Sequence, residues 1–351
     1  MSTSAPCRRR TRLTNPAIRA MSQHVINRRQ ALTGLAASLA LASGAAIGAE
    51  AVPAAFPKRP ITLIVPFSAG GPVDVLGRLL ADQYQARSGS AAIVENKTGG
   101  AGNIGIEAVR DAAPDGTRLL LIPAGNLTIN PTLMPDLPFN VERDFVPVSL
   151  LASAANILVV SPKLGVTSIP QLIDKAKTRK LSYGSPGVGS QLHLAMELFK
   201  EKTGADIQHI PYRGSPQALE DLLGGQIDVV ASNLPSVLSA VQGKLVVPLA
   251  MTTAQRSPLV PDVPTLAEAG VQGIDVTSWY GMLAPHGTPT DIRDAIFTVT
   301  RDVLSTPAMQ EKLSAQALSV TIETPDQLAA RIRRETALWA DVIQKEHITI
   351  Q

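Results

Sequence analysis

A loop with two adjacent glycines holds the residues best placed for chemistry. The aliphatic run 61–65 precedes it, so residues 66–74 are expected to join a strand to a helix. Four apolar side chains then follow at helical spacing: Val73, Leu76, Leu80 and Tyr84. Gly70 and Gly71 allow a tight turn and a close approach of backbone to a ligand, and Asp74 falls in the first helical turn. Because a helix start presents free N–H groups, this loop is either an anion site or simply a well-formed helix start.

A second glycine-rich loop, residues 184–190, occupies the same kind of position later in the chain. It follows the short run 181–183 and precedes a helical pattern that begins at Gln191, with Ser190 as the expected N-cap. The loop lacks the G-x-S-x-G spacing of a nucleophile elbow. One such loop in each half of the chain favours a ligand site between the halves. His193 either faces that site or packs in the core.

Three further polar residues follow predicted strands, which is where α/β sheets bind their ligands. Asn126 comes after the run 118–122, and Asn233 comes after 227–231. Arg213 follows a third strand and is the best single cation for a carboxylate. The alternative for Arg213 is a side chain that faces solvent.

No pattern predicts a cofactor or a metal. Residues 100–105 match G-x-G-x-x-G, but they follow the second predicted strand, and no acidic residue follows at the distance that a ribose contact needs. A structural helix entry is therefore favoured over a dinucleotide site. The histidines show no zinc-binding spacing, and Cys7 is the single cysteine. We expect no cofactor.

Short apolar runs alternate with helical patterns through two successive parts of the chain. This order predicts an α/β fold with two doubly wound domains, each a parallel sheet covered by helices. The runs 157–160 and 276–283 are expected to cross between the domains and to form a two-crossing hinge. The predicted domains are 56–157 plus 278–351, and 158–277. The Pro-rich stretch 127–147 is expected to be irregular.

The first 49 residues resemble an export signal. They contain seven arginines and no Lys, Asp or Glu, and the uncharged Ala/Gly/Leu run 31–49 follows the basic part. Arg28 and Arg29 resemble a twin-arginine motif, which predicts that export route. Cleavage is expected near Ala49 or Ala51, with an uncleaved membrane anchor as the alternative. Translation begins at Met1 or at Met21.

The charge of the chain changes sign once this leader is set aside. Removing its seven arginines from the 32 Lys and Arg leaves 25 basic residues against 29 acidic ones, a formal charge of −4. No cluster of Lys and Arg with interleaved aromatics follows, so nucleic acid is not an expected partner. Two Trp and four Tyr are too few for a sugar cleft built on stacked rings.

The chain resembles the periplasmic solute receptors of tripartite tricarboxylate transporters, the Bug-type binding proteins, over about residues 57–350. Seven stretches carry the resemblance in order: 66–74, 94–105, 113–116, 211–214, 221–228, 261–265 and 278–281. The resemblance implies a type II periplasmic-binding-protein fold that closes on small carboxylates. It implies that loop 66–74 holds one carboxylate through backbone groups and ordered water, and that loop 185–191 meets the far end of the ligand.

The sequence therefore predicts an exported, non-enzymatic and monomeric receptor for a small carboxylate, which it delivers to subunits of a membrane transporter. The ligand class stays open among di- or tricarboxylates, amino acids and aromatic acids. The alternatives are a secreted two-domain hydrolase or isomerase, and a receptor for a sensor kinase. The expected ligand-binding residues are Phe67, Ser68, Ala69, Gly70, Gly71, Asp74, Asn126, Ser185, Gly187, Val188, Gly189, Ser190, Gln191, His193, Arg213, Asn233 and Tyr280.

Overall fold

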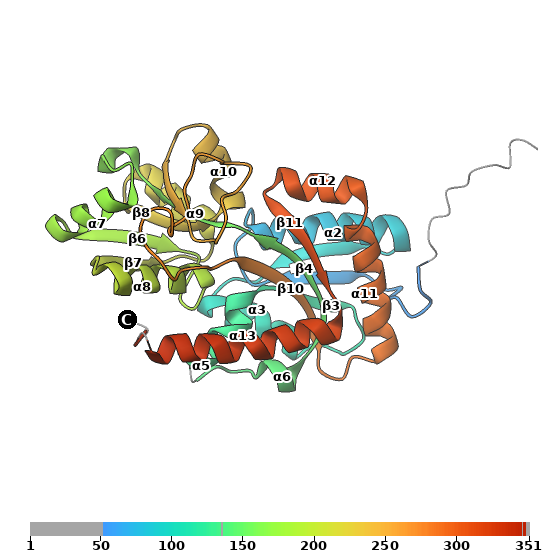
Figure 1. Cartoon of the computed structure of the whole chain (residues 1–351). Coiled ribbons are helices and arrows are strands. Elements are labelled where there is room, and N and C mark those ends of the chain that lie inside the picture. The colour runs from blue at the N-terminus through green and yellow to red at the C-terminus, as the bar shows by residue number, and fades with distance from the viewer. Residues whose placement is uncertain (1–51, 135, 346, 349–351) are drawn as a thin grey trace, which may run out of the picture. The chain divides into compact units, whose positions relative to one another are not determined.

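The computed structural model describes residues 52–134, 136–345 and 347–348. The expected leader, its twin arginines and both cleavage sites lie outside these residues. Two separate sheets divide the described chain into two lobes (Figure 1). The first sheet has the strand order β11-β4-β10-β3-β1-β2, and the second has the order β7-β6-β8-β5-β9. A two-domain α/β fold is confirmed.

The strands of the first sheet are β1 (Ile61–Val65), β2 (Ala92–Asn96), β3 (Arg118–Pro123), β4 (Phe145–Ala154), β10 (Ser278–Pro285) and β11 (Leu318–Glu323). Those of the second sheet are β5 (Asn156–Val160), β6 (Leu181–Ser185), β7 (Ile207–Pro211), β8 (Val229–Asn233) and β9 (Val247–Met251). Strands β1, β2 and β3 pair in parallel, as do β6, β7 and β8. Both sheets are nevertheless mixed, because β4, β5 and β10 pair antiparallel with their neighbours. These strands carry the chain between lobes without a crossover helix, so the prediction of fully parallel sheets was wrong.

Helices cover both faces of each sheet. The longer helices of the first lobe are α2 (Pro72–Ser88), α3 (Asn103–Arg110), α11 (Thr290–Leu304), α12 (Pro307–Ala315) and α13 (Pro325–Lys345). Those of the second are α7 (Ile169–Thr178), α8 (Gln191–Thr203), α9 (Ser215–Gly224) and α10 (Leu234–Gln242). One apolar cluster joins α2, α11 and α12 to one face of the first sheet, and another joins α3 and α13 to the opposite face. The second sheet is likewise packed between two clusters.

The stretch 127–147 is more regular than its composition predicted. It contains the last two residues of α4 (Ala124–Thr128), then α5 (Asn130–Leu133) and α6 (Val141–Asp144). These helices are four or five residues long, too short to show a periodic pattern. Two single-turn 3-10 helices complete the list: η1 (Gly100–Gly102) and η2 (Pro162–Leu164).

The two crossings lie side by side and are joined by buried amides. Strand β4 ends in the first sheet at Ala154, and β5 begins in the second at Asn156. The Nδ2 of Asn156 donates to the carbonyl of Val276 at 3.0 Å, and Asn233 Nδ2 donates to Ser278 Oγ at 2.8 Å. The sheets therefore change within a few residues of the predicted crossings, and we place the lobe boundaries there.

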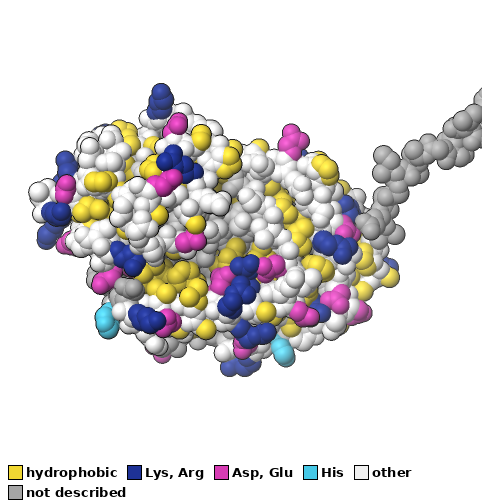
Figure 2. Space-filling model, viewed as in Figure 1, with side chains coloured by type: hydrophobic (Ala, Val, Ile, Leu, Met, Phe, Trp, Pro, Cys, Tyr) yellow, Lys and Arg dark blue, Asp and Glu magenta, His cyan; other side chains and the backbone are white. Residues whose placement is uncertain are grey.

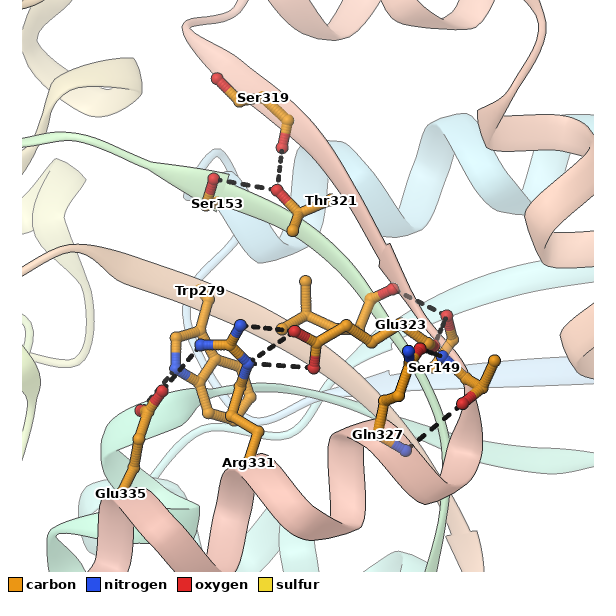
Figure 3. Close-up of polar contacts among 11 residues, drawn as sticks. Ser149, Ser153, Trp279, Ser319, Thr321, Glu323, Gln327, Arg331 and Glu335 are labelled. Atoms are coloured by element: carbon orange, nitrogen blue, oxygen red, sulfur yellow. Dashed lines mark hydrogen bonds and ion pairs between the residues drawn. The ribbon is translucent and has the colours of Figure 1, made fainter. Parts of the chain in front are cut away.

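A polar network fixes the C-terminal helix beside the returning strand (Figure 3). Arg331 of α13 pairs with Glu323 at the end of β11 and with Glu335, whose Oε2 accepts a 2.8 Å hydrogen bond from Trp279 Nε1. The guanidinium also lies over the Trp279 ring, 6.0 Å from its centroid. Trp279 is thus held within the first lobe. The far end of α13 differs, because Trp339 belongs to the apolar cluster of the second lobe.

Candidate functional site

A cavity of about 50 Å³ lies between the lobes. Its lining is Phe67, Ser68, Gly71, Pro72, Val73, Asp74, Pro123, Gly125, Asn126, Pro186, Ser190, Gln191, Leu192, Gly214, Ser215, Asn233, Ser278 and Tyr280. This lining contains no Lys or Arg side chain, and its single charged residue is Asp74. On the face that Figure 2 shows, Lys and Arg are interspersed with Asp and Glu, so no large basic field covers it.

Five helices begin at the cavity. Each follows a parallel strand, either directly or after a short loop. Helices α2 and α4 follow β1 and β3 in the first lobe, and α8, α9 and α10 follow β6, β7 and β8 in the second. The free N–H groups and the positive dipole end of a helix start both favour an anion. The fold thereby gathers the positive ends of five helices around one cavity whose lining has no cationic side chain.

Asp74 shapes the first glycine loop rather than facing the cavity as a free charge. Its carboxylate is buried and accepts four hydrogen bonds of 2.9–3.0 Å, two from Arg78 and one each from the Gly70 N–H and Asn96 Nδ2. Burial opposes ionisation, but these donors outweigh it and hold the pKa of Asp74 below its ordinary value. All the acceptor positions are occupied, so Asp74 is a structural anchor of loop 66–71.

Three buried hydroxyls in the lining have no hydrogen-bond partner among the described residues. They are Ser68 in the first lobe, Ser215 in the second, and Tyr280 on the hinge strand β10. Tyr280 is 1% exposed, and burial raises the pKa of its phenol, so the group remains a neutral donor. Since an unpaired buried polar group costs about 1–3 kcal/mol, the three hydroxyls mark where a bound molecule would form hydrogen bonds.

The lobes are closed on this cavity. The N–H of Ser68 donates across the interface to the carbonyl of Arg213 at 3.1 Å. On the other side of the cavity, the backbone of Gly125 lies against that of residues 189–191. Two contacts between the lobes, called seams below, therefore bound the cavity. The first seam joins Ser68 of the first lobe to the 213–214 segment of the second, and the second seam joins Gly125 to residues 189–191.

The structure brings about half of the predicted site residues to the cavity. Nine line it: Phe67, Ser68, Gly71, Asp74, Asn126, Ser190, Gln191, Asn233 and Tyr280. Eight lie outside the lining: Ala69, Gly70, Ser185, Gly187, Val188, Gly189, His193 and Arg213. Arg213 contributes its carbonyl to the seam rather than its guanidinium to the cavity. Nine further lining residues were not among the individually predicted ones: Pro72, Val73, Pro123, Gly125, Pro186, Leu192, Gly214, Ser215 and Ser278. Three of them, Pro72, Val73 and Pro186, lie within the predicted ligand loops 66–74 and 185–191. Most of the nine stand at a helix start after a strand, a position that could have identified them.

The two histidines behind the second loop form a stacked pair. The rings of His193 and His209 lie 4.4 Å apart, and His193 Nδ1 accepts a hydrogen bond from the Gly189 N–H at 3.3 Å. His209 Nε2 lies 2.7 Å from the hydroxyl of Ser185. Ser185 is fully buried and does not line the cavity, so this Ser–His contact supports the loop and has no access to a substrate.

We expect acid to destabilise the protein through these histidines. Burial lowers the pKa of His193 to about 4 and that of His209 to about 3, with Lys200 adding to the effect on both and Glu197 opposing it on His193. The unfolded chain takes up these protons near pH 6.5, so stability is full above that pH and falls as the pH drops toward the folded values. The expected loss from pH 7 to pH 5 is about 2 kcal/mol for each histidine.

Urea unfolding at pH 7, 6 and 5 measures this effect. His209→Phe keeps a stacked ring but cannot take a proton, so it should lose about half as much stability on acidification as the wild type. His286→Gln, a change at an exposed position, is the matched control and should follow the wild type. An unchanged pH slope in His209→Phe would contradict the expectation.

None of the described helices combines the length and apolar character needed to cross a bilayer. No three His, Cys, Asp or Glu side chains of the described residues gather where they could hold a metal ion.

The fold and the cavity define a two-lobed solute-binding protein of the periplasmic type. Residues 76–348 match the family model described as tripartite tricarboxylate transporter family receptor, so the chain belongs to this family.

The chain is similar to BugT of Bordetella pertussis, with 38% identity over 83% of this chain and 90% of that protein. A Rhodopseudomonas palustris protein solved with adipate shares 34% identity, with TM-score 0.80 over 84% of this chain and 99% of that one. MatC from the same species, solved with malate, shares 29% identity, with TM-score 0.78 over 82% of this chain and all of that one.

Proposed function

We propose that this protein captures a small carboxylate in the cavity between its lobes and delivers it to a tripartite tricarboxylate-type transporter in the cytoplasmic membrane. The observation that carries the proposal is the convergence of five helix starts on a cavity between the lobes whose lining has no cationic side chain. Each helix start contributes about 0.3–2 kcal/mol toward a bound anion, in addition to its hydrogen bonds. The adipate and malate bound by two structural relatives support a carboxylate ligand.

The proposal assigns the ligand contacts to residues of both lobes. Ser68 and the helix start at Gly71 act from the first lobe, Ser190 and Ser215 act from the second, and Tyr280 acts from the hinge strand. A carboxylate that contacts all of them holds the lobes together, so binding and closure are coupled.

Family membership supports a periplasmic location and contact with transporter subunits. We further propose that the receptor is a monomer. We propose that the leader directs export and is removed near Ala49 or Ala51. We further propose that the protein is not an enzyme, since the Ser185–His209 pair is sealed behind the second loop.

Titration calorimetry with malate, adipate, citrate, glutamate and benzoate tests the proposal. At least one of these acids should bind, and adipamide, which matches adipate in size but carries no charge, should not. Binding of none of the five, or equal binding of adipate and adipamide, would contradict a carboxylate receptor.

Two substitutions test whether the helix starts or the charge of Arg213 holds the carboxylate. Arg213→Ala should change Kd by less than about threefold, because the guanidinium is not part of the lining. Gly71→Val should weaken binding at least about tenfold by filling the cavity beside the start of α2. Gly71 has φ −77°, and a methyl group there would lie 3.5 Å from the nearest atom, the carbonyl oxygen of Ser68, so the backbone tolerates a side chain. Loss of binding in Arg213→Ala with Gly71→Val unaffected would show that a point charge holds the ligand.

A further inference from the structure

The first seam is formed where Gly214 meets Ser68. A methyl group on Gly214 would overlap the hydroxyl of Ser68, which belongs to the other lobe. Gly214 has φ 161° and ψ 161°, an extended conformation that any residue adopts. The backbone of the second lobe therefore has no local need for glycine at this position. The overlapping atom is the end of a side chain that can rotate, so a Cβ at Gly214 is compatible with closure once the Ser68 hydroxyl turns away.

At the second seam, the missing side chain would meet backbone atoms instead. Gly125, in α4 of the first lobe, would place a methyl group 2.5 Å from the carbonyl oxygen of Gly189 and 3.2 Å from the N–H of Gln191. Both of those atoms belong to the second lobe. Gly125 has a helical conformation rather than a left-handed one, so alanine fits its backbone. Again, the nearest atoms to the missing side chain lie across the cleft.

We infer that Gly125 is a positioning residue for closure: its bare backbone lets the two lobes meet at the second seam. A Cβ atom essentially never lies as close to another atom as the 2.5 Å that a side chain at Gly125 would require, and the atom it would meet is a backbone oxygen that cannot rotate away. A single methyl group at Gly125 should hold the lobes apart while each lobe folds normally. The inference rests on the proposed function, in which closure traps the solute, but the closing motion can be measured without any solute.

A disulfide across the first seam would lock the two lobes in the closed arrangement, and its formation would therefore report closure directly. The Cβ of a side chain at Gly214 would lie 3.4 Å from Ser68 Cβ, close to the 3.5–4.5 Å found between bonded cysteines. In a Cys7→Ser background, the full chain with Ser68→Cys and Gly214→Cys has these two thiols alone. Oxidation should bond them whenever the lobes close, and the rate reports how often that happens. Mobility on a non-reducing gel and mass spectrometry measure the yield.

Gly125→Ala is then added to this double-cysteine background. We expect the rate of disulfide formation to fall at least about tenfold, which corresponds to a tenfold smaller closed population. Gly224→Ala is the matched control, because its methyl group would meet nothing closer than 3.9 Å, and it should leave the rate unchanged. Equal rates with and without Gly125→Ala would overturn the inference, and so would failure of the double-cysteine chain to form the bond at all.

Gly125→Ala alone provides an independent measurement on the chain without added cysteines. Its radius of gyration by small-angle scattering, in a carboxylate that closes the wild type, should stay at the open value. Its melting temperature without ligand should match that of Gly224→Ala, which shows that both lobes fold. Closure of Gly125→Ala to the wild-type envelope would refute the inference. If no carboxylate binds the wild type while the disulfide still responds to Gly125→Ala, the proposed function fails and the closure inference stands.

Discussion

Replacing Tyr280 by Phe is expected to weaken carboxylate binding and at the same time to raise the melting temperature of the ligand-free protein. The phenol is fully buried at the cavity, and its hydroxyl has no partner in the described structure. A hydrogen bond from this donor to a carboxylate is worth about 1.5–3 kcal/mol, so its loss should raise Kd roughly ten- to a hundredfold. Without ligand, removing the unsatisfied hydroxyl should stabilise the fold by about 1–2 kcal/mol, or roughly 1–4 °C.

Tyr84→Phe is the matched control in the same lobe. The Tyr84 hydroxyl is also fully buried, but it is hydrogen-bonded to Thr300. Its removal should lower the melting temperature and leave Kd unchanged, whereas Tyr280→Phe should raise both quantities. Calorimetric titration and thermal unfolding of the two variants measure this contrast. A Tyr280→Phe variant that binds as tightly as the wild type would remove Tyr280 from the site.

The sequence allowed prediction of those elements whose local residue pattern matches their place in the folded protein. The strand 61–65, the helix start at Pro72 and the N-cap at Ser190 all follow from residue type and spacing, and the structure contains each of them. Strand β11 was not predicted. Its residues 318–323 are mostly half-buried, because they form an edge that pairs with β4 alone, and such a strand has weak alternation.

The candidate site was predictable in position but not in detail. A strand followed by a glycine-containing helix start indicates which end of a sheet binds ligand, and this rule located both loops. It could not show that the carbonyl of Arg213, rather than its guanidinium, faces the other lobe. Nor could it show that Gly125 and Gly214 meet atoms of the opposite lobe, since that depends on how two separately folded units approach each other.

Replacing Asp74 by Asn should affect stability and binding together. Asp74 is 3% exposed, and its carboxylate accepts hydrogen bonds from the Gly70 N–H, Asn96 and Arg78. An amide keeps the volume but replaces one acceptor oxygen with a donor that opposes these groups. The expected loss is about 1–3 kcal/mol of unfolding free energy, below that of a fully buried pair because the Arg78 side chain is 54% exposed. Loop 66–71 then loses its anchor, and Kd should rise by at least about tenfold.

The pH dependence of the unfolding free energy distinguishes loss of the Asp74 charge from a packing defect at the same position. The folded pKa of Asp74 is lowered, so its contribution is complete above the unfolded value near 3.9 and is lost as the pH falls through the folded value. The stability difference between the wild type and Asp74→Asn should therefore be constant from pH 7 to pH 5 and should shrink below about pH 4. Asp82→Ala, at an exposed position of the same helix, is the matched control and should match the wild type throughout. A difference that persists unchanged below pH 3 in urea unfolding would show that the loop depends on the shape of the Asp74 side chain and not on its charge.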